Sequence, residues 1–174
     1  MLILNFFVEG IAAIMLLLDH NNLFLFHFLN PVQFFLISSY IQKLVLSAKA
    51  KFAILVITLM AILTSIIFSF TIQPINEYNS YWLLLQNLLV CIFILYYFYE
   101  QTLNTNTGQK HEKSILLVNI GLFIYAITNL FIGGFLNPLI KYNVHIALYV
   151  YFGSVLVSYI TYILFIFAFK AEIN

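Results

Sequence analysis

Few side chains in this sequence could do chemistry, and each of them interrupts a long apolar stretch. Glu9 is the only carboxylate deep in such a stretch, which makes it a candidate for carrying a proton within the membrane. No second ionisable group accompanies it at a similar depth, as proton relays usually require. The remaining candidates are histidines and amides: His27, Asn30, Gln33, Gln86, Asn87, Asn119, Asn129 and His145.

Metal binding and enzymatic catalysis find little support in these residue types. His27 and His145 have no Cys, Asp or Glu within helical reach, whereas a zinc site needs at least three protein ligands. His-Glu-x-x-His, Gly-x-Ser-x-Gly and glycine-rich phosphate loops do not occur in the sequence. We therefore predict no metal site, no cofactor and no enzymatic activity.

The elements that must position these residues are long apolar helices. Charged residues make up 7% of the 174 residues, against about 25% in ordinary soluble proteins. A bilayer core takes about 20 apolar residues per helix, and the chain repeats that length several times. The sequence predicts an all-α fold, a polytopic transmembrane helix bundle that forms a single domain over 1–174. About six helices are expected, over 2–18, 23–42, 52–70, 81–99, 114–135 and 143–169, with the fifth broken at Asn137-Pro138.

The lysines predict the orientation of this bundle. All seven basic residues are Lys, and cytoplasmic segments carry the Lys excess in membrane proteins. Only Lys141 follows an odd-numbered helix. The others follow helices two, four and six: Lys43, Lys49, Lys51, Lys110, Lys113 and Lys170. Both termini are therefore expected in the cytoplasm.

This orientation gathers the polar residues at one depth. Helices two, four and six then run from outside to inside, and their polar residues come early, whereas Asn129 comes late in the oppositely directed helix five. Five residues are predicted to bind a ligand in a small polar pocket in the outer half of the membrane: His27, Asn30, Gln86, Asn87 and Asn129. The competing interpretation is that the amides only join helices, through hydrogen bonds of about 0.6–2 kcal/mol.

Two further patterns predict packing. Tyr81 and Trp82 open helix four, as in an aromatic belt at a membrane interface. Gly153, Ser154 and Ser158 form a small-residue face on helix six, which predicts a close helix–helix seam.

Charge and cysteine content limit the partners. The formal net charge is +1 and Arg is absent, so no basic surface for nucleic acid is predicted. Cys91 is the only cysteine, which excludes a disulfide within one chain. The expected partners are the lipid bilayer and, through the Lys-bearing loops, another membrane protein or a cytoplasmic signalling partner.

The chain resembles small uncharacterised multi-helix integral membrane proteins of Bacteroidota over roughly residues 23–170. Three segments carry the resemblance: Trp82–Glu100, Asn119–Phe131 and Tyr159–Phe169. The chain departs from that group at Leu116-Leu117, where an aromatic pair is usual, and in having six helices where seven are usual. The second departure suggests that an N-terminal helix is missing relative to the group. The resemblance implies location in the bacterial inner (plasma) membrane and implies no reaction.

Three hypotheses of function follow. The first is a non-catalytic sensor or accessory subunit with the outer pocket as its binding site. The second is a small proton-coupled transporter or channel in which Glu9 and the same residues line the path. The third is an organelle-encoded subunit of a respiratory complex, because an excess of Phe, Tyr, Leu, Ile and Asn is typical of AT-rich coding.

Overall fold

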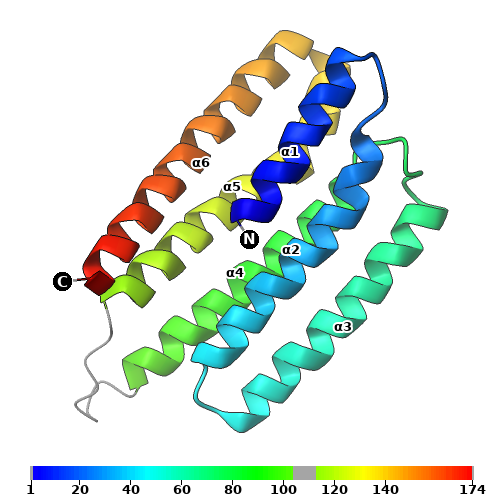
Figure 1. Ribbon diagram of the computed structural model, residues 1–174. Coiled ribbons are helices and arrows are strands. Elements are labelled where there is room, and N and C mark those ends of the chain that lie inside the picture. Colours follow the sequence, from blue (N-terminus) through cyan, green and yellow to red (C-terminus); the bar gives the residue numbers. More distant parts are fainter. Residues whose placement is uncertain (1, 104–112, 174) are drawn as a thin grey trace. The chain divides into compact units, whose positions relative to one another are not determined.

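Helices form all the regular structure in the part of the chain that the computed structural model describes, residues 2–103 and 113–173. Figure 1 shows α1 (Leu2–Leu17), α2 (Leu23–Leu44), α3 (Ala48–Thr71), α4 (Ser80–Leu103), α5 (Lys113–Tyr142) and α6 (Val144–Ile173). Within these residues α2 to α6 are long and apolar enough to cross a membrane. The all-α prediction is confirmed, and the chain has the pattern of an integral membrane protein.

The first helix is the shortest. α1 has 16 residues, which corresponds to about 24 Å, less than the roughly 30 Å of a bilayer core. It ends in a left-handed residue, Asp19, with φ 56°. The next amide, His20 N–H, donates back to the Met15 carbonyl at 2.9 Å. This is a Schellman-type helix end, in which Asp substitutes for the usual glycine.

The fifth helix differs most from its predicted bounds. α5 continues through Pro138 to Tyr142, so the predicted break at Asn137-Pro138 is wrong. Proline removes only one helical hydrogen bond, and in lipid the remaining backbone groups gain more by staying helical than by being exposed. The other helix ends lie within four residues of the predicted ends. α3, for example, begins earlier because the Ser47 hydroxyl accepts the Ala50 N–H at 3.4 Å.

The chain divides into two compact units, Met1–Gln86 and Asn87–Asn174. In the first unit α2 packs against α1 and α3. α3 buries a single face towards the unit, made of Ile54, Thr58, Ala61 and Ser65, and three of these side chains are small enough for close helix contact. Its other side carries exposed apolar residues such as Met60 and Phe70, which suit contact with lipid.

In the second unit α5 and α6 form an antiparallel pair (Figure 1). They approach closely at Gly121, where an added Cβ would lie 3.1 Å from the Phe165 ring. The Thr161 hydroxyl lies 3.4 Å from the Gly121 carbonyl across this contact and 3.3 Å from the Val157 carbonyl of its own helix, so the two carbonyls share its one hydrogen. Gly153 is exposed, and an added Cβ there would meet nothing within 4 Å. Gly153 therefore lies outside this contact, whereas Ser154 and Ser158, the other residues of the predicted seam, are half-buried.

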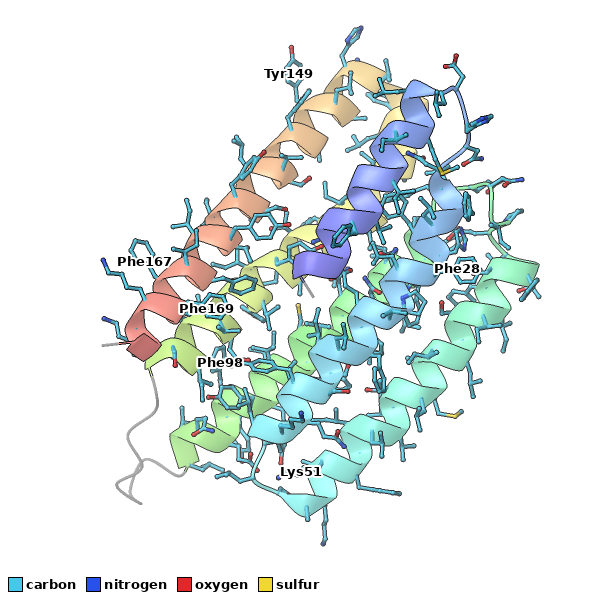
Figure 2. The ribbon with its side chains drawn as sticks, viewed as in Figure 1. Phe28, Lys51, Phe98, Tyr149, Phe167 and Phe169 are labelled. Carbon is cyan, nitrogen blue, oxygen red and sulfur yellow. The ribbon has the colours of Figure 1, made fainter. Side chains whose placement is uncertain are left out.

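The outward side chains of this unit are large and apolar. Tyr149 and Phe167 project from α6 on the side away from α5 (Figure 2), and both are exposed. The buried α6 residues recur at helical spacing, and two of them, Thr161 and Phe165, meet Gly121 of α5: Ala147, Thr161, Phe165 and Ala168. This division is expected for a helix with protein on one side and lipid on the other.

Candidate functional site

His27 joins three segments of the first unit. It lies on α2, is 5% exposed, and its Nδ1 is 2.8 Å from the Ser69 hydroxyl on α3. Its Nε2 is 3.0 Å from the backbone carbonyl of Glu77, in the loop between α3 and α4. A carbonyl only accepts, so Nε2–H donates to it and the ring carries a proton at Nε2. We call His27, Ser69 and the Glu77 carbonyl the His27 clamp.

The loop that His27 contacts is held by side chains from both sides. Asn21, in the turn after α1, donates from its Nδ2 to the Asn76 carbonyl at 3.1 Å. Gln73, just after α3, donates from Nε2 to the Ser80 hydroxyl at 2.8 Å. Its Oε1 accepts the Tyr81 backbone N–H at 3.0 Å. Gln73 therefore supplies a hydrogen-bond acceptor at the start of α4, the task of an N-cap side chain.

Asn79 occupies the N-cap position of α4 but does not use its side chain there. Its backbone carbonyl accepts the Leu83 N–H at 3.1 Å, as the first bond of the helix. Asn is a preferred N-cap residue because its side-chain oxygen satisfies a free N–H in the first turn. Here Gln73 fills that role, and neither Nδ2 nor Oδ1 of Asn79 has a hydrogen-bond partner among the described residues. The side chain is nevertheless only 2% exposed.

Two more buried polar groups without partners follow Asn79 at helical spacing. The Trp82 indole N–H and the Gln86 side-chain carbonyl make no hydrogen bond within the described chain, although the residues are 0% and 6% exposed. Spacings of three and four residues place Asn79, Trp82 and Gln86 along one face of α4. We call these three residues the α4 stripe. The Trp82 ring also packs edge-to-face against Phe34 of α2, with ring centroids 5.6 Å apart.

The residues predicted from the sequence are divided between the two units. His27, Asn30 and Gln86 are buried in the first unit. Asn87 is buried in the second, and Asn129 donates from Nδ2 to the Tyr125 carbonyl of its own helix at 2.9 Å. The convergence of all five residues stays a prediction.

Two other candidates have separate outcomes. The side chain of Glu9 lies outside the described residues. His145 is exposed at the start of α6, where its backbone N–H donates to the Asn143 side chain at 2.9 Å. Among the described residues, no group of three or more His, Cys, Asp or Glu side chains could hold a metal ion.

Sequence reasoning missed the side chains that complete the site. Gln73 is not among the residues that the sequence singles out, and the sequence predicts Trp82 to be a belt residue. In the structure Trp82 is fully buried, while Tyr81 beside it is exposed. The dipeptide Asn79-Ser80 before an apolar run is a helix-start signal and could have indicated the position. It could not have shown that Gln73, which lies outside α4, caps this helix.

Comparison with known proteins adds no relative from which a role could be transferred. No family model, no curated protein and no solved structure matches this chain.

Proposed function

We propose that this protein is a non-catalytic sensor or accessory subunit of a bacterial inner membrane that binds a small polar ligand at the α4 stripe. The supporting observation is the set of buried polar atoms without partners on Asn79, Trp82 and Gln86. Each such group costs about 1–3 kcal/mol, and natural proteins keep such costs mainly where function needs them. A ligand that satisfies these groups would recover that free energy on binding.

The His27 clamp supports a role in transmission. One side chain connects α2 to α3 and to the loop that leads into the α4 stripe. A ligand that moves this loop would change the hydrogen bonds of His27 and so the position of α2 relative to α3. The far ends of these two helices carry Lys43, Lys49 and Lys51. By the lysine rule this end is proposed to face the cytoplasm and a partner there.

The Ser69–His27 pair does not favour catalysis. A nucleophilic serine needs backbone N–H donors nearby to stabilise an oxyanion. Ser69 lies in the last turn of α3, where a helix presents carbonyls and the negative end of its dipole. Its hydroxyl oxygen also lies 3.0 Å from the Ser65 carbonyl of its own helix, which can take the single hydroxyl hydrogen in place of His27 Nδ1. These features suit a structural serine better than a nucleophile.

A flux measurement tests the proposal against the transporter alternative. Purified protein in liposomes should carry protons, urea and glycerol no faster than protein-free vesicles do. Under the same conditions the emission of Trp82, the only tryptophan, should respond to ligand. Protein-dependent flux of any of these solutes would overturn the sensor proposal and favour a transporter.

A further inference from the structure

We infer that the α4 stripe takes a small neutral molecule of the amide class, with a carbonyl acceptor beside an N–H donor. The inference rests on the proposed function, because it names the ligand of the same site. It is drawn from what the buried groups offer, from the charges around them and from the spacing between them.

The hydrogen-bonding groups of the α4 stripe determine which donors and acceptors a ligand must carry. The Trp82 indole can only donate, so the ligand must present an acceptor. The Gln86 carbonyl can only accept, so the ligand must also present a donor. Asn79 offers one group of each kind. An amide carries a carbonyl and an N–H on one carbon, and it satisfies both requirements together.

The charges described in the first unit disfavour an ionised ligand. Its lysines, Lys43, Lys49 and Lys51, lie at the opposite end of α2 and α3 from the loop, as Figure 2 shows for Lys51. Asp19 and Glu77 are the acidic side chains described in this unit, and both are exposed. Among the described side chains of this unit, a buried carboxylate or ammonium would find no buried Lys, Asp or Glu as a counter-ion, and an unpaired buried charge is costly. The ligand is therefore neutral.

The spacing limits its size. Trp82 and Gln86 are four residues apart on α4, a rise of about 6 Å. Side chains on adjacent turns are neighbours, and one amide group with a hydrogen bond of about 2.9 Å at each end has the size to bridge two of them. The Trp82 and Phe34 rings, packed edge-to-face, supply an apolar surface beside these groups. That surface suits a small methyl or methylene substituent.

Acetamide is the probe that tests the assignment. Trp82 emission, recorded for the whole chain in nanodiscs, should change saturably with acetamide at millimolar concentrations, since so small a ligand binds weakly. Acetate, its charged analogue, should give no saturable change. Acetone, which lacks the donor, should bind at least about tenfold more weakly, because the Gln86 carbonyl stays unpaired. N-methylacetamide represents an amide of a peptide or lipid, and tighter binding than acetamide would assign the site to such a chain.

Matched variants test whether the change in Trp82 emission comes from binding at the α4 stripe. Gln86→Met keeps the side-chain length and should reduce acetamide affinity to the acetone level. Gln42→Met, a control on α2 whose Nε2 donates to the Lys51 carbonyl at the lysine end, should keep the wild-type affinity. Should Gln86→Met not fold, the acetamide, acetone and acetate series on the wild-type protein still decides. A response that is absent, linear, or equal for acetamide and acetone overturns the amide assignment. Failure of the sensor proposal would show separately, as solute flux.

Discussion

At the scale of single residues, Gln73 has the capping role that the N-cap position suggests for Asn79. Asn79 stands at the N-cap of α4 without capping it, and Gln73 caps the helix from the end of α3. The amide of Asn79 is therefore left buried without a hydrogen bond to the described residues. The stability of the start of α4 then depends on a residue outside that helix. The sequence could predict neither point, because both depend on which side chain lies within hydrogen-bonding distance of the Tyr81 N–H in the folded chain.

Capping by Gln73 predicts different effects of two alanine substitutions. Gln73→Ala should lower the free energy of unfolding by about 1–2 kcal/mol, since the cap and the bond to Ser80 are both lost. Asn79→Ala should be neutral or stabilising by up to about 1 kcal/mol, because it removes an unpaired buried group. Equilibrium unfolding in mixed micelles measures both values. Equal losses for the two variants would mean that Asn79 is the true cap.

The His27 clamp predicts energetic coupling between α2 and α3. In a double-mutant cycle of His27→Ala and Ser69→Ala, we expect a coupling free energy of about 0.5–1.5 kcal/mol, the net value of one hydrogen bond. Ser158→Ala serves as the control, because Ser158 makes the same bond to its own helix, at 3.1 Å to the Ser154 carbonyl. Its cycle with His27→Ala should give no coupling. A clamp cycle near zero would remove His27 from the proposed path of transmission.

At the scale of helices, apolar length is enough to predict the elements but not the positions at which they pack closely. The six helices appear in the described residues because each apolar run satisfies its backbone hydrogen bonds most easily as a helix. The site of closest approach depends instead on which face meets a neighbour, and periodicity within one strongly apolar helix does not reveal this. Gly153 looked like a seam residue and is exposed, whereas Gly121 meets Phe165.

The contact at Gly121 should be sensitive to a single methyl group. Gly121→Ala places a Cβ 3.1 Å from the buried Phe165 ring, and the bond from Thr161 keeps the helices close. We expect a loss of about 1–3 kcal/mol from overpacking. Gly153→Ala, in open space, should be neutral or slightly stabilising, because alanine favours helix over glycine. Thermal unfolding of the two variants compares them directly, and equal melting temperatures would contradict the seam.

At the scale of the whole molecule, the lysine distribution predicts which end of each span is exposed to which compartment. In a Cys91→Ala background, cysteines at Asn76 and Asn143 should react with an impermeant maleimide added to intact cells. A cysteine at Ser47 should react only after lysis, because it lies between Lys43 and Lys49. The reverse labelling pattern would invert the protein and move the α4 stripe to the cytoplasmic half.

The short link between Gln73 and Tyr81 also bears on how the chain is made. Only eight positions separate the two partners, so the turn can close once the first residues of α4 leave the ribosome. We expect the translocon to receive α3 and α4 as a preformed hairpin. Gln73→Ala should then lower the fraction of nascent chains inserted with the correct topology, measured by glycosylation mapping in microsomes. Asn79→Ala should leave that fraction unchanged. A side chain that closes a turn in the mature protein would thus also guide its biogenesis.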